Sequence, residues 1–301
     1  MVEFKNEKVA IPVVLFAGLL WSFGPLVVRH MDEPGLVPWQ YIFARGLTIF
    51  IVLNLYLYFE EGKNFYKNYF KIGVSGIIGG TGLGIAMITF IYSITNTTAA
   101  VTLLCLAAMP FFTALLGFLF LKEKISINVW IAISIATIGI IIIALGNTEK
   151  NSLIGLIFGM TSSIGFSVFS VTLRWRKETP KFTTVAIAGL FCAFVATIFI
   201  LLSGSSFFST SYNGTLFSLH GTIVCMGLIL YSIGSKVIPA AELTLLSLTE
   251  VIGGIFWVWL PLFGVNEIPS TNTIIGGFFL FMSIIYYSLT IKTNRRFIAL
   301  N

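Results

Sequence analysis

Two ionisable side chains lie inside long apolar stretches of the sequence, where a charge is costly. Glu250 falls ten residues into the stretch 240–263, and Arg45 falls seven residues into the stretch 38–58. A charged side chain at the centre of a bilayer costs about 3 kcal/mol on insertion scales, so such residues mark places where a substrate, an ion or a proton binds. We therefore take these two residues as the first candidates for binding chemistry.

Glu250 has two functional interpretations. Its carboxylate binds the amine or another cationic part of a substrate, or it takes up and releases a proton, because burial disfavours the charged form of a carboxyl group. The structural alternative is a buried glutamate that hydrogen-bonds between helices. On one continuous helix Ser247 and Trp257 share its face and add a hydroxyl and an aromatic wall. We expect all three residues to bind substrate.

Arg45 keeps its charge at any accessible pH and so needs a carboxylate, carbonyl groups or water around it. The functional interpretation is a clamp for a substrate carboxylate or a partner in a gate, and the structural one is an arginine that reaches loop carbonyls. Trp21 stands four residues before Pro25 in the first apolar stretch. We expect Arg45 and Trp21 to line the same substrate site as Glu250.

Four further residues are candidates for gating or coupling. Pro25 and Pro110 lie within apolar stretches, where a proline removes a backbone donor and kinks the helix. Glu242 follows Pro239 near the start of the ninth stretch, where it either stabilises a helix N-terminus or forms part of a gate. His30 ends the first stretch and could titrate near neutral pH.

The sequence argues against enzyme chemistry and bound cofactors. Neither of the two histidines has a second histidine or cysteine at metal-ligand spacing, so we expect no metal site. The glycine-rich segment 79–82 is not followed by the Lys-Ser/Thr of a phosphate loop, so we expect no nucleotide. The paired acids 32–33 and 60–61 fall in loops on opposite sides, which disfavours a membrane transferase. We expect no cofactor.

The composition is that of a membrane protein. Of 301 residues, 57% are hydrophobic and 10% are charged, whereas a soluble domain has about 25% charged residues. Backbone groups in hydrocarbon must bond within their own segment, so each span is expected to be helical. We predict an all-α polytopic protein with ten transmembrane helices at 9–29, 38–58, 70–92, 98–121, 127–145, 153–173, 183–203, 217–237, 240–263 and 272–291.

The charges set the orientation. With the N-terminus inside, 15 of the 18 basic residues fall on the inner side and two on the outer side. This bias predicts that both termini are cytoplasmic, and it explains the net charge of +6 without nucleic acid, for which no motif is present. We expect a multi-pass protein of the bacterial cytoplasmic (inner) membrane, as a monomer or homodimer.

The chain contains a weak internal repeat. Three segments recur at offsets of 145, 141 and 144 residues: Trp21–Arg29 with Phe166–Arg174, Ala99–Leu104 with Ala240–Leu245, and Glu123–Ser126 with Glu267–Ser270. We predict two five-helix repeats, residues 1–148 and 149–301. Because five is odd, the second repeat enters the membrane inverted, which is an architecture of secondary transporters.

Several of these residues together resemble a known family. They are Trp21-Ser22 with Pro25, Phe43-Ala44-Arg45, the stretch Ala99–Ser126 with Pro110 and Leu121–Lys124, and Ile238–Glu242 leading to Leu248-Thr249-Glu250 and Asn266-Glu267. The chain resembles an EamA-type member of the drug/metabolite transporter superfamily from about Val9 to Leu289. The family often has a proline after the glutamate of span nine, and here Val251 follows Glu250.

The resemblance implies a ten-helix carrier that exports or imports small metabolites such as amino acids, their derivatives, purines, vitamins or cationic metabolites. We expect a secondary active transporter that works by alternating access, with the acidic residue favouring a substrate that has an amine, and proton coupling at Glu250 as an open alternative. Two other functions stay open: a flippase for lipids or lipid-linked molecules or a channel-like facilitator, and a purine or vitamin transporter. The expected partners are a small-molecule substrate and the bilayer.

Overall fold

The computed structural model describes residues 7–123, 125–146, 153–176, 178–266, 268 and 270–298, and all regular structure in this part of the chain is helical. Within these residues eight helical segments are long and apolar enough to cross a membrane, and shorter apolar stretches occupy Ile127–Ile142 and Ile274–Tyr287. The chain is therefore a multi-pass α-helical membrane protein, as the composition predicts.

The helices follow one another with short connections. The first part of the chain contains α1 (Glu7–Trp21), α2 (Gly24–Arg29), α3 (Pro38–Glu61), η1 (Gly62–Tyr66), α4 (Lys67–Phe70), α5 (Gly73–Asn96), α6 (Ala99–Leu106), α7 (Met109–Leu116), η2 (Gly117–Leu121) and α8 (Ile127–Gly146). The second part contains α9 (Leu153–Trp175), α10 (Lys181–Ser203), α11 (Ser211–Gly234), α12 (Ala240–Leu246), α13 (Thr249–Trp259), η3 (Pro261–Phe263) and α14 (Thr271–Ile298).

Three apolar segments are each broken into two helices. The interruptions fall at residues 22–23 between α1 and α2, at 107–108 between α6 and α7, and at 247–248 between α12 and α13. The first two confirm the expected proline kinks. The ring of a proline clashes with the carbonyl four residues earlier, and α1 and α6 end four residues before Pro25 and Pro110, at Trp21 and Leu106.

The third interruption has no proline and depends on hydroxyl groups. Thr249 Oγ1 donates to Leu15 O on α1 at 3.1 Å and lies 3.2 Å from Leu246 O. Ser247 Oγ donates to Thr244 O at 2.8 Å. Gly18 lets α1 approach this point, because a Cβ at Gly18 would lie 2.1 Å from Thr249 Oγ1. The break is therefore held by contacts between helices as well as by local ones.

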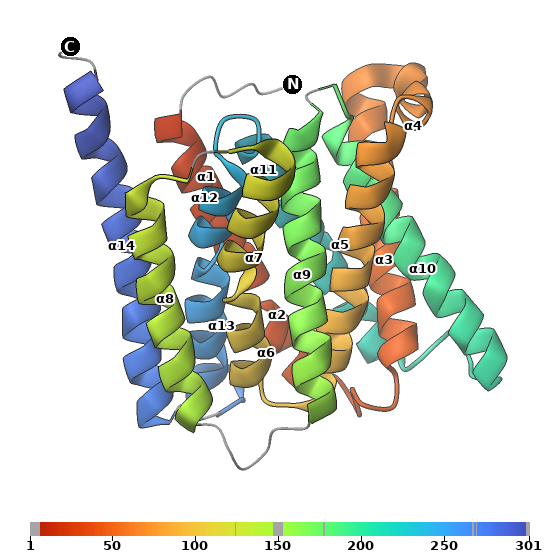
Figure 1. The fold of residues 1–301 in the computed structure, drawn as a ribbon. Helices are drawn as coiled ribbons and strands as arrows, with labels where there is room; N and C mark the ends of the chain where they lie inside the picture. Colours follow the sequence, from red (N-terminus) through yellow and green to blue (C-terminus); the bar gives the residue numbers. More distant parts are fainter. Residues whose placement is uncertain are drawn as a thin grey trace.

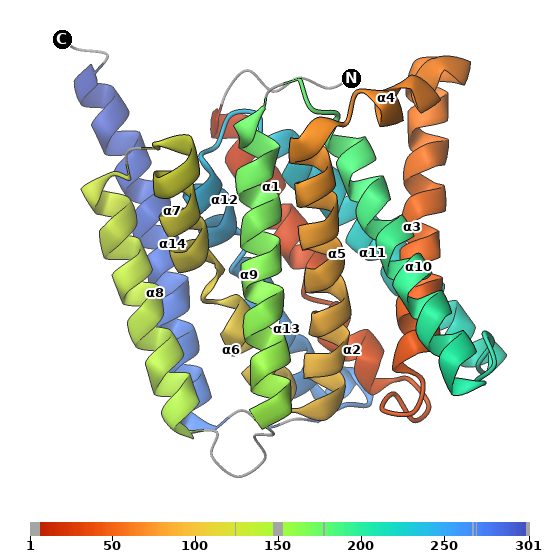
Figure 2. The same cartoon turned by 45° about the vertical axis from the view of Figure 1, so that its right-hand side comes forward.

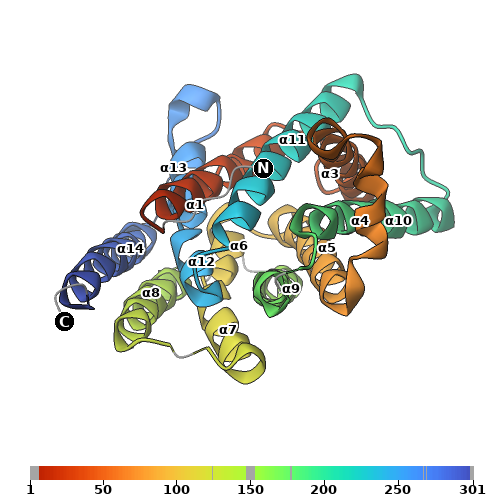
Figure 3. The same cartoon turned by 90° about the horizontal axis from the view of Figure 1, so that it is seen from above.

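The helices form one bundle, in which broken segments lie between flanking pairs. The pair α8 and α14 lies at one flank and the pair α3 and α10 at the other (Figures 1 and 3). Between them stand α1, α5, α9 and α11, with α5 packed on α9 and α1 packed on α11 (Figure 2). The broken segments therefore lie in the middle of the bundle, between the two flanking pairs (Figure 3).

The helix α1 begins and the helix α14 ends at the same end of the bundle, which we call the terminal end (top of Figure 1). The other end, where α2 ends and α9 begins, is called the opposite end. Segments at the terminal end carry the described basic residues Lys63, Lys67, Lys71, Lys122, Arg174, Lys181 and Lys236. The positively charged loops that the sequence predicts on one side thus gather at one end.

Candidate functional site

A cavity of about 70 Å³ lies in the centre of the bundle, at the level of the three helix breaks. Its walls are mostly apolar, with a few polar groups. The lining residues are Trp21, Arg45, Leu83, Ala86, Met87, Phe90, Leu106, Met109, Ser162, Phe166, His220, Val224, Leu228 and Glu250. A small, mainly apolar cavity with a few convergent polar groups is the usual form of a small-molecule site.

The three broken segments all reach this cavity. Trp21 is the last residue of α1, Leu106 the last of α6 and Met109 the first of α7, and Glu250 lies in the first turn of α13. Discontinuous helices that meet at one point expose helix ends where a substrate can be bound. The chain therefore places its irregular backbone around the cavity.

Glu250 is the acidic residue of the cavity, and Arg45 lies in the same cavity. Glu250 is 8% exposed, and among the described residues its carboxylate forms no hydrogen bond and no ion pair within 4 Å. A buried charge without a partner is unfavourable, so this group is available for a ligand or a proton. Its place in the first turn of α13 suits a carboxylate, because the N-terminal end of a helix dipole is positive.

Arg45 is the basic residue of the same cavity. It is 3% exposed, it donates from Nη2 to Met87 O at 3.1 Å, and its guanidinium carbon lies 5.7 Å from the centre of the Tyr41 ring. A guanidinium has five N–H donors, so most of its capacity is not used by these contacts. The structure thus brings the predicted acid and the predicted base to one cavity without joining them in an ion pair.

Trp21 lies in the cavity wall, as predicted. Its indole donates from Nε1 to Val224 O at 3.2 Å, and its ring meets Phe166 edge-on with centroids 5.5 Å apart. The residue is 5% exposed and is fixed by partners from α9 and α11. Trp21 therefore forms a rigid aromatic side of the cavity.

Ser247 and Trp257 do not line this cavity. Ser247 is fully buried at the break between α12 and α13, where its hydroxyl donates to the main chain. Trp257 donates from Nε1 to Ser22 Oγ at 2.7 Å and stacks on Phe23 with centroids 4.7 Å apart. Their substrate-binding roles stay predictions, and in this structure they pack around the breaks in the first and ninth spans.

The two other gate candidates lie at the two ends of the bundle. Glu242, in the first turn of α12 at the terminal end, accepts a hydrogen bond from the Tyr287 hydroxyl. His30 follows α2 at the opposite end, with Nδ1 at 2.8 Å from Leu26 O and Nε2 at 2.6 Å from Phe263 O. His30 therefore connects the end of the first span to the segment after α13. The gating roles of both residues stay predictions.

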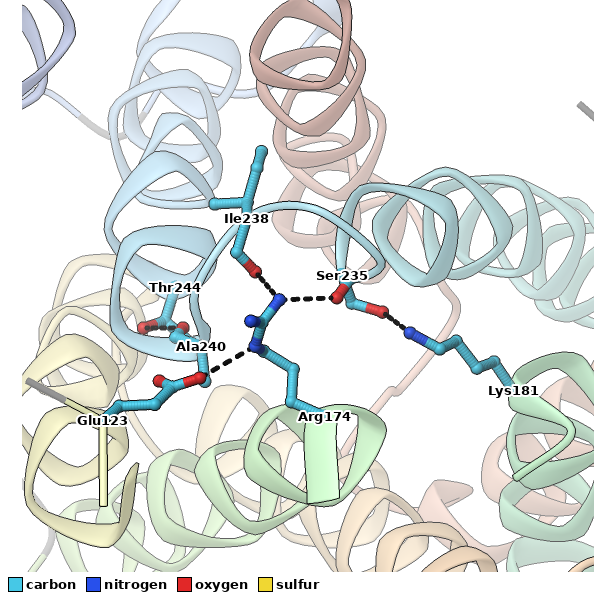
Figure 4. A network of polar contacts seen from close by, with 7 residues as sticks. All are labelled: Glu123, Arg174, Lys181, Ser235, Ile238, Ala240 and Thr244. Carbon is cyan, nitrogen blue, oxygen red and sulfur yellow. Dashed lines mark hydrogen bonds and ion pairs between the residues drawn. The ribbon is translucent and has the colours of Figure 1, made fainter. Parts of the chain in front are cut away.

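A polar network connects several segments at the terminal end (Figure 4). Arg174 Nε donates to Glu123 Oε1 at 2.8 Å, and Arg174 Nη1 donates to Ser235 O at 3.1 Å and to Ile238 O at 2.9 Å. Lys181 Nζ adds a hydrogen bond of 2.8 Å to Ser235 Oγ. This network borders a second cavity of about 170 Å³, lined by Glu123, Ile125, Val129, Arg174, Pro239, Ala241 and Glu242. Glu267, which the sequence repeat pairs with Glu123, lies outside the described residues.

Sequence reasoning missed His220 as a site residue. The prediction placed it at the start of a span beginning at residue 217, but α11 begins at Ser211, so His220 lies inside the helix and is 1% exposed. The error arose because the first residues of α11 are mostly polar. The spacing of His220, Val224 and Leu228, four residues apart, was a usable signal, since such residues share one helix face.

Residues 8–145 match the model of the EamA-like transporter family. Two curated relatives, each described as an uncharacterized transporter, come from Helicobacter pylori strains J99 and 26695 and are 27% and 26% identical over 170 residues. Each match covers 56% of this chain and 56% of the relative, so the chain spans about half the length of the curated relatives that it matches.

The fold has also been seen before. A solved structure, described only as the crystal structure of a protein, superposes with a TM-score of 0.76 at 17% sequence identity, over 96% of this chain and 99% of that chain. At this identity the likeness concerns the fold alone. Together with the family match over residues 8–145, these findings support the resemblance of the chain to EamA-type members of the drug/metabolite transporter superfamily that the sequence motifs indicate.

Proposed function

We propose that this protein is a secondary active carrier that moves a small metabolite with an amine or other cationic group across the membrane by alternating access. One observation carries the proposal: Glu250 is buried, has no protein partner among the described residues, and faces the cavity where three helix breaks meet. A carboxylate in this setting needs a positive ligand or a proton. The substrate supplies the positive charge in one step of the cycle.

Two inverted repeats, residues 1–148 and 149–301, supply the moving parts of this carrier. Pairings within the bundle support the repeat, because α3 packs on α10 and α8 packs on α14, which are counterparts in the two halves. The breaks at 107–108 and 247–248 differ by about the same offset that relates Ala99 to Ala240. In the cycle one half rocks against the other around the central cavity.

Two arginines give further support for the repeat. Arg29 donates to Ile94 O and Thr97 O, each at 3.3 Å, at the opposite end. Arg174 donates to the carbonyls of residues 235 and 238 at the terminal end. Residues 235 and 238 lie 141 positions after Ile94 and Thr97 respectively. The same offset relates Ala99 to Ala240. Each half thus uses an arginine in the same way, at opposite ends of the bundle.

The protein operates in the bacterial cytoplasmic membrane with both termini in the cytoplasm. The basic residues at the terminal end favour this orientation, since positively charged loops stay on the cytoplasmic side. The curated relatives are bacterial. In this orientation the Arg174 network closes the cytoplasmic end of the bundle.

The substrate is an amino acid, an amino-acid derivative or a cationic metabolite. Glu250 receives its positive group, Trp21 and Phe166 cover its apolar part, and Arg45 is placed to receive an anionic group if one is present. When no substrate is bound, a proton on Glu250 removes the cost of the buried charge, which couples the carrier to protons.

Flux measurements in proteoliposomes test the proposal. A thermal-shift screen of amino acids, cationic metabolites, purines and vitamins first finds a ligand, because a compound that binds only the folded state raises the melting temperature. We expect Glu250→Gln to abolish flux of that ligand and Glu178→Gln, an exposed carboxylate at the terminal end, to leave it unchanged. Flux at the wild-type rate in Glu250→Gln would contradict the role of Glu250, and a screen without any ligand would contradict the metabolite carrier.

A further inference from the structure

We propose that His220 and Arg45 together form a subsite for the carboxylate of the substrate in the central cavity, and that Tyr41 is the residue that positions both. The inference rests on the proposed function, because it names the chemistry of the same site. Arg45 and Tyr41 lie one turn apart on α3, and His220 faces them from α11.

The hydrogen bond between Tyr41 and His220 fixes the tautomer of the imidazole. The Tyr41 hydroxyl contacts His220 Nδ1, and the two residues are each 1% exposed. The hydroxyl proton of Tyr41 has no other acceptor among the described residues, so the hydroxyl donates and Nδ1 accepts. In a neutral imidazole the second nitrogen then carries the hydrogen. His220 Nε2 is therefore a donor.

No described residue accepts a hydrogen bond from this donor. Among the described residues His220 Nε2 forms no hydrogen bond, although the ring is almost fully buried and lines the cavity. Gly24 at the start of α2 lies beside the ring, and a Cβ there would crowd Nε2 at 3.0 Å. Buried donors are nearly always satisfied, so the free Nε2 points to a ligand that accepts a hydrogen bond.

Arg45 supplies the charge of the subsite. Tyr41 contacts both donors, with its hydroxyl on the imidazole and its ring 5.7 Å from the guanidinium carbon of Arg45. A carboxylate offers two oxygens and accepts several hydrogen bonds, which matches one imidazole N–H and the unused donors of a guanidinium. With Glu250 in the same cavity, the substrate carries an ammonium and a carboxylate, as a zwitterion does.

Nitrogen NMR tests the tautomer directly. The chain has two histidines, so His30→Gln leaves His220 as the single labelled imidazole in protein made with isotope-labelled histidine. For His220 we expect an unprotonated Nδ1 and a protonated Nε2 at mildly alkaline pH. In Tyr41→Phe the fixed tautomer is lost, and in Tyr56→Phe, a change of another tyrosine on α3, it is kept. An unprotonated His220 Nε2 in the His30→Gln protein overturns the proposal.

Three matched probes test the ligand: L-alanine, propionate, which lacks the amine, and ethylamine, which lacks the carboxylate. We expect L-alanine and propionate to shift the Nε2 resonance in a saturable way and ethylamine to leave it in place. Tyr41→Phe weakens propionate binding by about tenfold, as expected for a lost hydrogen bond that orients a donor to a charged group. His220→Leu abolishes the response in thermal shift, and His220→Gln, which keeps an N–H donor, retains part of it.

The binding and transport measurements distinguish a failure of the carboxylate subsite from a failure of the proposed role of Glu250. If ethylamine raises the melting temperature and loses that effect in Glu250→Gln, while propionate and L-alanine leave Nε2 unmoved, the carboxylate subsite is wrong and the cationic site stands. If propionate shifts Nε2 but Glu250→Gln transports at the wild-type rate, the subsite stands and the proposed role of Glu250 is wrong.

Discussion

Arg174 and Glu123 form an ion pair that crosses the boundary between the two proposed halves, with 2.8 Å between Nε and Oε1. Glu123 follows η2 in the first half, and Arg174 lies at the end of α9 in the second half. Their side chains are 26% and 22% exposed for Arg174 and Glu123 respectively, so water only partly screens them. If the proposed halves rock against each other, we expect this contact to hold the terminal end closed.

We predict that Glu123→Gln opens the terminal end more often. A partly exposed ion pair contributes about 0.5–1 kcal/mol, which corresponds to roughly a twofold to fivefold change in the open population. Ala241 lines the neighbouring cavity, and the three native cysteines are buried, so Ala241→Cys reports opening through its rate of reaction with a membrane-impermeant thiol reagent. The rate rises by that factor in Glu123→Gln. It stays unchanged in Glu178→Gln, and equal rates in both variants would argue against the gate.

We predict that substrate movement is accompanied by a pH change inside proteoliposomes, which a trapped pH-sensitive dye records. The reason is that Glu250 is buried, forms no hydrogen bond or ion pair among the described residues, and exchanges a proton for the substrate in the proposed cycle. Glu242→Gln keeps the pH change, since Glu242 lies at the terminal end and bonds to Tyr287. Saturable flux without any pH change would leave the carrier in place and remove proton coupling.

We predict that Gly18→Ala destabilises the protein. The added methyl group would lie 2.1 Å from Thr249 Oγ1 and 3.1 Å from Ser247 O, and overpacking of this kind costs about 1–3 kcal/mol. Gly214→Ala is the matched control, because no atom lies within 4 Å of its Cβ position on α11. The melting temperature in detergent falls in the first variant and is equal or higher in the second. A normal melting temperature in Gly18→Ala would mean that α1 can move away from the break.

We predict that Val251→Pro folds normally. Val251 N donates only to Leu248 O at 3.0 Å, three residues earlier, and the helix is already interrupted before it. Ile255→Pro, one turn further along α13, removes a regular helical bond and costs about 3 kcal/mol. Thermal unfolding distinguishes them: Val251→Pro melts near the wild type and Ile255→Pro well below it. Equal losses in the two variants would show that α13 needs a regular backbone from its first turn.

The proline breaks could be read from the sequence, and the third break could not. Pro25 and Pro110 act on the carbonyl four residues earlier, which is a local effect that needs no knowledge of neighbours. The break at 247–248 depends on Thr249 reaching Leu15 O on another helix and on the space left by Gly18. Contacts between segments more than two hundred residues apart have no signature in one sequence.

Only some of the candidate site residues line the cavity, and the break at 247–248 accounts for one that does not. Glu250, Arg45 and Trp21 were found because a charge or an aromatic ring at that depth is informative by itself, and all three line the cavity. Ser247 was placed on the face of Glu250 by helical spacing, and the interruption between them removes that relationship. Helical spacing predicts which residues share a face of a helix, but it does not predict how far along the helix the cavity extends. Trp257 lies on the same helix as Glu250, and its side chain contacts Ser22 and Phe23 instead of the cavity.

The counterpart of Pro110 in the second half is Val251, which lies 141 residues later. A proline makes the bend in the fourth segment permanent, whereas Val251 keeps its N–H and allows the ninth segment to straighten. We therefore expect the two proposed halves to differ in stiffness at these two breaks. For the proposed carrier we therefore expect the inward-open and outward-open forms to differ in free energy even without ligand, with more of the movement at the ninth segment than at the fourth.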